Sequence, residues 1–225
     1  MKLKITLAAL ILLIIGCAGP KETRYYLLEY VPTISAERLQ QGPWPWRVRI
    51  KELTIAEAYR RNEIVYRQSP HEMRFYNYEL WAVKPEYLVT DMLYRHLRDA
   101  KLFRELTRSI ETEEADYVLK GEINALEEYD NEDLWFAHLA LSLYLEDSRT
   151  NKIVWMRNWD YRKKVLQQEP VFVVRELSEL LEKTVNEASL SLDSMFRQPA
   201  MRDTVAVKKF ELDAPIAPPP PDEAR

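Results

Sequence analysis

The chain has 225 residues, of which 47% are hydrophobic and 30% are charged, and its formal net charge is −4. This length and apolar content are sufficient for one domain with a sizeable core, and the net negative charge gives no support for nucleic-acid binding. Only four glycines occur, so a glycine-rich phosphate-binding loop is essentially excluded.

The first residues have the pattern of a bacterial export signal. Two early lysines form a short basic region, and the apolar run 5–15 that follows is too short to span a bilayer core of about 30 Å. The run ends in Ile-Ile-Gly-Cys, which resembles the bacterial lipobox and places its cysteine at Cys17. We therefore interpret residues 1–16 as a lipoprotein signal peptide and residues 17–24 as a lipidated tether.

Cys17 is the only cysteine of the chain. An incidental buried thiol is the alternative interpretation, but the lipobox resemblance implies that the thiol accepts a diacylglyceryl group and the freed amine another acyl chain. Each buried CH₂ contributes about 0.8 kcal/mol, so several chains hold a protein on a membrane far longer than one. The next residue is Ala18 rather than Asp, which by the usual sorting pattern indicates the outer membrane. We expect a covalent lipid on Cys17 and no other cofactor.

Runs of β-branched and aromatic residues and, at 46–50, an alternation of apolar with basic residues predict strands in the first half of the chain. Residues 32–45 contain several prolines and no periodicity, which indicates a loop. A turn signal, Gln68-Ser69-Pro70, predicts that the strands on either side of it form an antiparallel hairpin. Pro85 then begins a helix with one broad apolar side, which is expected to end near Ala100. The strands are expected at 25–30, 46–50, 64–66, 73–78 and 103–107.

The second half of the chain predicts three long strands and the longest helix. The acidic segment 127–133 is interpreted as a turn, and Pro170 begins a helix whose apolar residues recur at three- and four-residue steps up to Met195. The three strands, expected at 117–125, 135–146 and 152–165, suggest an antiparallel meander.

Together these elements predict an α+β fold over residues 25–197, in which two helices cover one face of an antiparallel β-sheet. The helices have one apolar stripe each and must bury it against the sheet, which leaves the other sheet face partly open. Residues 198–225 follow as a proline-rich tail that we expect to be disordered or polyproline-like.

No motif in the sequence indicates catalysis or metal binding. The histidines at His71, His96 and His138 are predicted on a turn, a helix and a strand, without metal-ligand spacing. The acidic cluster 111–116 lacks the pattern of a calcium loop, and no serine lies in a GxSxG context. We therefore expect a protein that is not an enzyme.

The segment from Tyr59 to Tyr87 resembles the auxiliary lipoprotein family of ABC-type transporters. The resemblance depends on Tyr59-Arg60-Arg61, on Ile64-Val65-Tyr66-Arg67, on the tyrosine-rich strand after them, and on Trp81-Ala82 before a helix. Val83 stands where the family usually has Glu, and Pro85 falls one position later than in the common pattern.

The resemblance implies a non-enzymatic, outer-membrane-anchored accessory lipoprotein. Its implied partners are an inner-membrane ABC permease and ATPase and a periplasmic protein of the MCE (mammalian cell entry) type, in systems that move phospholipids or other hydrophobic compounds. A structural envelope lipoprotein that tethers periplasmic or peptidoglycan-associated assemblies is the alternative. An envelope hydrolase is a third candidate, which the lack of a visible nucleophile and base disfavours.

The aromatic and arginine residues of the same segment are candidates for partner binding, because Tyr, Trp and Arg dominate interface energetics. They could dock the MCE-type protein or a second copy of the chain. The alternative is a packed aromatic core with cross-strand pairs. The candidate residues are Tyr59, Arg60, Arg61, Tyr66, Arg67 and Trp81.

Overall fold

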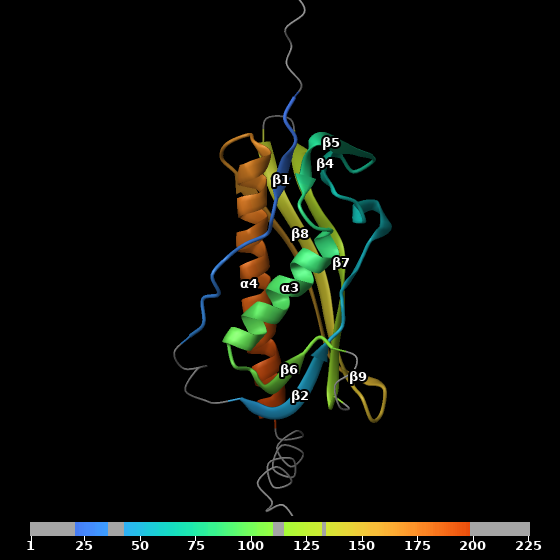
Figure 1. The fold of residues 1–225 in the computed structure, drawn as a ribbon, viewed down its shortest axis with the longest axis vertical. Coiled ribbons are helices and arrows are strands. Elements are labelled where there is room, and N and C mark those ends of the chain that lie inside the picture. Colours follow the sequence, from blue (N-terminus) through green and yellow to red (C-terminus); the bar gives the residue numbers. More distant parts are fainter. Residues whose placement is uncertain (1–20, 36–42, 110–114, 132–133, 199–225) are drawn as a thin grey trace, which may run out of the picture.

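The computed structural model describes residues 21–35, 43–109, 115–131 and 134–198. Within these residues one nine-stranded sheet is covered on one face by two α-helices (Figure 1). The predicted signal peptide, Cys17 and nearly all of the predicted tail lie outside the described residues. The elements are β1 (Arg24–Tyr26), β2 (Trp44–Ile50), β3 (Thr54–Ile55), the 3₁₀ turn η1 (Glu57–Tyr59), β4 (Glu63–Ser69), β5 (Glu72–Trp81), α3 (Pro85–Asp99), β6 (Phe103–Thr107), β7 (Tyr117–Asn131), β8 (Leu134–Asp147), β9 (Lys152–Val165) and α4 (Pro170–Arg197).

The long strand β7 connects the two halves of the sheet. On one side it pairs antiparallel with β8, which pairs antiparallel with β9. On its other side β2, β3 and β4 pair in succession with residues 117–119, 122–123 and 128–129, all parallel to β7. Strand β6 extends the sheet beyond β2, while β5 and then β1 extend it beyond β4. Strands β2, β3 and β4 therefore lie one after another along the same edge of β7, in the place of a single long neighbouring strand.

The α+β class with two helices on one face is confirmed, while the pairing of the sheet is mixed. The meander of β7, β8 and β9 and the β4–β5 hairpin are antiparallel, whereas β2 with β6, β1 with β5, and all pairs made by β2, β3 and β4 with β7 are parallel. The connection from β2 to β6 passes through α3, and a crossover of that kind joins parallel strands.

The predicted turn at 127–133 is wrong for most of its length. Strand β7 continues to Asn131, and Glu127 and Glu128 are buried within it. The segment 122–131 contains no glycine or proline to end the strand, and both carboxylates have hydrogen-bond partners, Glu127 in η1 and on β8 and Glu128 on β5. The acidic residues are thus part of the sheet.

The core lies between the sheet and the helices. At Gly121 the backbones of β7 and β8 are so close that a Cβ would lie 2.4 Å from the carbonyl oxygen of Ser142, so only glycine fits there. Strand β9 contacts α4 through two hydrogen bonds, in which the indole N–H groups of Trp155 and Trp159 donate to Ser191 and Glu187. Fully buried side chains from both layers fill the space: Leu139, Leu141, Leu143 and Leu145 of β8 with Leu177, Leu181, Val185 and Leu192 of α4.

After β1 the chain continues as an extended strap that runs beside α4 (Figure 1). The amide of Glu29 donates to Ser178 Oγ at 3.2 Å, and the amide of Thr33 donates to a carboxylate oxygen of Glu182 at 3.0 Å. Leu28, on the inner side of the strap, is buried. Among the described residues no helix combines the length and apolar composition that crossing a bilayer requires.

Candidate functional site on the open face of the sheet

Two of the six predicted partner-binding residues are core residues. Trp81 is 2% exposed and Tyr59 is 5% exposed, so neither offers a surface to a partner. The Trp81 amide donates to the carbonyl of Asn62 at 2.6 Å, which joins the end of β5 to the residue before β4. These two residues hold the hairpin in position, and partner binding by the set as a whole stays a prediction.

The other predicted residues lie closer to the surface but in different places. Arg60 is partly exposed and forms an ion pair with Glu57 at 3.4 Å. The Arg61 guanidinium lies 3.6 Å from the centre of the Phe75 ring. The Tyr66 ring packs against the Tyr76 ring in a tilted arrangement, with ring centres 4.7 Å apart. The structure therefore does not bring the six residues together as one surface.

Arg67 instead joins Tyr59 in a polar network around the buried carboxylate of Glu127. The Tyr59 hydroxyl donates to Glu127 Oε2 at 2.7 Å, Arg67 Nε donates to the same oxygen at 3.1 Å, and Arg67 Nη2 donates to the Tyr59 hydroxyl at 2.9 Å. His138, which faces Glu127 across the β7–β8 pair, contacts Oε1 through Nδ1 at 2.9 Å. Its Nε2 lies 3.0 Å from Asp160 Oδ1 on β9. The network thus ties η1 and β4 to the meander.

The network keeps Glu127 ionised. Burial alone would raise the pKa of this carboxyl, but the hydrogen bonds from His138, Tyr59 and Arg67 and the charge of Arg67 outweigh burial and hold the pKa below its usual value. Burial and the hydrogen bond to Glu127 raise the pKa of Tyr59, so this phenol stays protonated. A carboxylate that accepts this many hydrogen bonds has a fixed orientation, which makes the site rigid.

A groove of about 410 Å³ opens beside this network, on the sheet face opposite the helices. Its floor includes Ala125 and Ala140, which are paired across β7 and β8 and are buried although neither described helix covers this face. The Arg162 guanidinium lies 4.7 Å from the centre of the Tyr129 ring at the same groove. The lining residues are Tyr59, Arg67, Pro70, Asn124, Ala125, Glu127, Tyr129, His138, Ala140, Asp160 and Arg162.

This arrangement can bind and orient a polar group, because arginine, tyrosine and carboxylate side chains surround a small-residue floor. Among the described residues no group of three or more histidine, cysteine or carboxylate side chains is placed to hold a metal ion. His138 has both ring nitrogens directed at carboxylates, so the part of the site that the structure describes gives it a structural role between β7 and β9.

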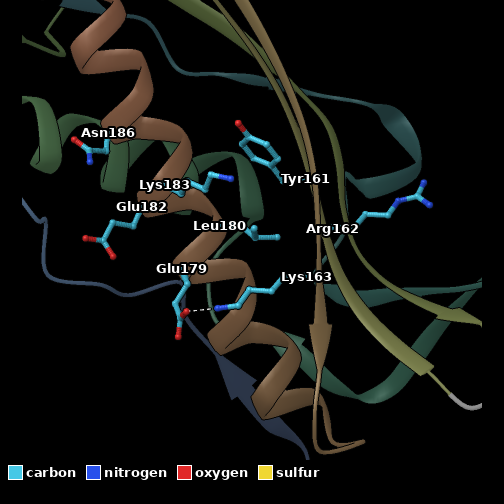
Figure 2. Close-up of a pocket in the computed structure, with 8 residues that line it drawn as sticks. All are labelled: Tyr161, Arg162, Lys163, Glu179, Leu180, Glu182, Lys183 and Asn186. Atoms are coloured by element: carbon cyan, nitrogen blue, oxygen red, sulfur yellow. Dashed lines mark hydrogen bonds and ion pairs between the residues drawn. The ribbon is translucent and has the colours of Figure 1, made fainter.

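A second hollow, of about 710 Å³, lies between β9 and α4 on the helix side (Figure 2). Its charged groups largely neutralise one another: Lys163 forms ion pairs with Glu176 and Glu179, and the Lys183 ammonium lies 3.9 Å from the centre of the Tyr161 ring. Figure 2 shows Arg162 pointing away from this hollow, to the other side of the strand, which agrees with its place in the groove. We therefore take the open-face groove as the candidate site.

Sequence reasoning identified Tyr59 and Arg67 but missed their partners. Glu127 was assigned to a turn, and Asp160 and Arg162 carried no motif. The one usable signal was the absence of glycine and proline from 122–131, which favours a continued strand over a turn.

A sequence model of the ABC-type transport auxiliary lipoprotein component family matches residues 26–189, which include α3, the whole meander and most of α4. No sequence among the curated proteins matches significantly.

Solved structures show the same fold. A crystal structure of a DUF330 protein from Xanthomonas campestris is similar at 18% identity with a TM-score of 0.70, over 79% of this chain and 99% of that one. The crystal structure of an uncharacterized protein is similar at 12% identity with a TM-score of 0.61, over 76% of this chain and 99% of that one. Since the family match covers well over half of the sequence, the chain belongs to the ABC-type transport auxiliary lipoprotein family.

Proposed function

We propose that this chain is a non-enzymatic auxiliary component of an ABC transport system of the MCE type, held by acylated Cys17 in the outer membrane. Its system would move phospholipids or other hydrophobic compounds across the envelope, with ATP hydrolysis performed by a separate ATPase. The observation that carries the proposal is the family match over residues 26–189. The lipobox before Cys17 supports the anchor, and Ala18 after it favours the outer membrane.

The open-face groove is the surface we assign to the periplasmic MCE-type protein. The helices leave this face of the sheet uncovered, and the groove presents Arg162 and Tyr129, residue types that contribute strongly to interfaces. The Glu127 network fixes the groove wall before a partner arrives, which reduces the entropy lost on binding. Tyr59 and Arg67 act here as positioning residues.

Photo-cross-linking in intact envelopes tests this assignment. A photoreactive amino acid at Asn124, which lines the groove and is exposed, should capture the MCE-type protein. The matched control is the same amino acid at Leu190, which is exposed on the outer side of α4. Adding Arg162→Glu to the Asn124 probe should abolish capture while circular dichroism stays unchanged, because Arg162 is exposed and its cation–π contact is with the partly exposed Tyr129 ring.

Equal capture from Leu190 and Asn124 would contradict the docking surface, and capture of no transport component from either position would contradict the transport role. Capture of peptidoglycan-associated proteins alone would favour the structural envelope lipoprotein. The permease and ATPase are expected only in complexes that also contain the MCE-type protein.

A further inference from the structure

Large apolar side chains are exposed around one end of the domain. Leu166, in the loop after β9, is 83% exposed, and Val171, in the first turn of α4, is 43% exposed. Tyr25 on β1 is 66% exposed, although its neighbour Tyr26 is buried. Exposed apolar residues also occur near the β8–β9 turn, at Ile153, Val154 and Met156, so exposure alone does not distinguish this end. What distinguishes it is that the segment after Cys17 enters the domain here.

These side chains surround the end of the domain instead of gathering on one face. Strand β1 starts and α4 begins at the same end of the longest axis (Figure 1). Tyr26 packs on the helix side of the sheet and Tyr25, the next residue on the strand, points to the opposite side. Val171 belongs to the helix layer. An occupant that contacts both layers at once must meet the domain end-on.

The chain before this end limits what the occupant can be. Lys21, the first described residue, follows Cys17 by four residues, which span at most about 14 Å when fully extended. The polar headgroup layer on each side of a bilayer is about 5 to 8 Å thick. If Cys17 carries the lipid anchor, as the proposed function holds, this end of the domain cannot leave the neighbourhood of the lipid surface.

We propose that the domain stands on the lipid surface with this end, placing Leu166, Val171 and Tyr25 in the headgroup region. Tyrosine and aliphatic side chains are stable at that depth, and the exposed lysines Lys21 and Lys164 are available to lipid phosphates beside them. Helix α4 leads away from this end for its 28 residues, about 42 Å. The turn between β8 and β9 lies at the far end, in reach of soluble partners (Figure 1).

Site-specific fluorescence quenching tests this orientation. The sequence contains a single cysteine, so once Cys17 is acylated an introduced cysteine is the only thiol that a fluorophore can label. We would label Leu166→Cys and Val171→Cys in the acylated full-length mature chain and reconstitute it in phosphatidylethanolamine–phosphatidylglycerol vesicles that contain headgroup-spin-labelled lipid. The matched controls are Met156→Cys, near the start of β9, and Leu190→Cys, in the distal half of α4, which are 47% and 53% exposed.

Several-fold stronger quenching at residues 166 and 171 than at residues 156 and 190 is the expected result. Quenching at Leu190→Cys as strong as at Leu166→Cys would overturn the proposal, because the domain would then lie flat on the surface. Acylation of the chain is verified by mass spectrometry. Equally weak quenching at all four positions of this acylated chain would overturn the proposal too, since the domain would then be held away from the lipid surface by the segment after Cys17. A free Cys17 in the wild-type chain would show instead that the anchor itself is wrong.

Discussion

Glu127 and Glu128 are adjacent residues of β7 whose side chains lie on opposite faces of the sheet. Glu127 faces His138 across the strand pair, on the open side, and Glu128 faces Ala137, on the helix side. Both carboxyl groups are almost completely buried. Their chemical surroundings, however, have opposite effects on their charge.

Glu127 receives hydrogen bonds from a cation, a histidine and a phenol, which hold its pKa below the usual value despite burial. Burial raises the pKa of Glu128 to about 8, since the hydrogen bond from Tyr76 lowers it only in part and the charge of Asp130 adds to the rise. Burial alone therefore does not decide the charge of a carboxyl group; the partners that the fold brings to it do. The open face carries a fixed anion, and the helix side carries a neutral acid at pH 7.

Glu128→Gln should produce the largest change, in the pH dependence of stability. An acid whose folded pKa is about 8 and whose unfolded pKa is near the model value of 4.5 binds its proton more tightly in the folded state, so stability is lost as the pH rises between these values. Relative to the variant, the wild type should lose about 1.4 kcal/mol of unfolding free energy per pH unit from this group, roughly 5 kcal/mol in all. Denaturant unfolding at pH 5, 7 and 9 measures this difference.

At pH 5 the two proteins should be nearly equally stable, because a glutamine amide replaces a protonated carboxyl of the same shape. At pH 9 the variant should be the more stable protein. Parallel stability curves for the two proteins over this range would show that Glu128 is already ionised in the folded state.

Arg67→Met should give the second largest effect, because it removes the cation that helps to keep Glu127 charged. The variant keeps much of the side-chain volume but removes the cation from Glu127, and breaking a buried ion pair typically costs 3–5 kcal/mol. Because the Arg67 side chain is 24% exposed, we expect the low end, about 3 kcal/mol of unfolding free energy. Arg60→Met is the control, since its ion pair is exposed and should contribute well under 1 kcal/mol. Equal losses in the two variants would mean that the Glu127 network does not depend on Arg67.

The elements of the fold were largely predictable because each has a local signal. The strands predicted at 103–107 and 152–165 match β6 and β9, and prolines mark the starts of α3 and α4. The direction of pairing was not predictable in this way. Periodicity tells which face a side chain takes, but it carries no information on which strand lies beside β7 or on its direction.

The candidate site was predictable only for the residues that carry the family pattern. Tyr59 and Arg67 lie in that pattern, but Glu127, His138 and Asp160 come from three strands that are brought together by the register of the sheet. The separations of these residues along the sequence form no motif, so the sequence alone does not indicate that they come together. Buried acidic residues also look like a solvated turn when their partners are unknown, which is why the segment after residue 126 was assigned to the wrong class.

His138→Ala should have an intermediate effect, about 2 kcal/mol, because it leaves a buried acceptor on Glu127 without its partner. His138→Asn should recover part of this loss, since its amide can still donate toward Glu127. Asp160→Asn is the matched control: its side chain is 70% exposed, so the loss should stay below about 0.5 kcal/mol. Thermal unfolding of the three variants ranks them, and a loss in Asp160→Asn as large as in His138→Ala would place the important contact on β9 instead of on Glu127.

Tyr76→Phe should give the smallest effect, about 1 kcal/mol for a lost hydrogen bond, and it sharpens the account of Glu128. The Tyr76 hydroxyl lies 3.0 Å from one carboxylate oxygen of Glu128 and favours the charged form, so its removal should raise the pKa of Glu128 further. Carbon-13 NMR titration of the Glu128 carboxyl follows this shift directly. Tyr66→Phe is the control, because the hydroxyl that bonds Glu128 belongs to Tyr76, against which Tyr66 only packs. In this control the titration midpoint of the Glu128 carboxyl should remain that of the wild type. A downward shift in Tyr76→Phe would mean that the phenol stabilises the protonated acid, which would reverse the role assigned to this hydrogen bond while leaving burial as the cause of the raised pKa.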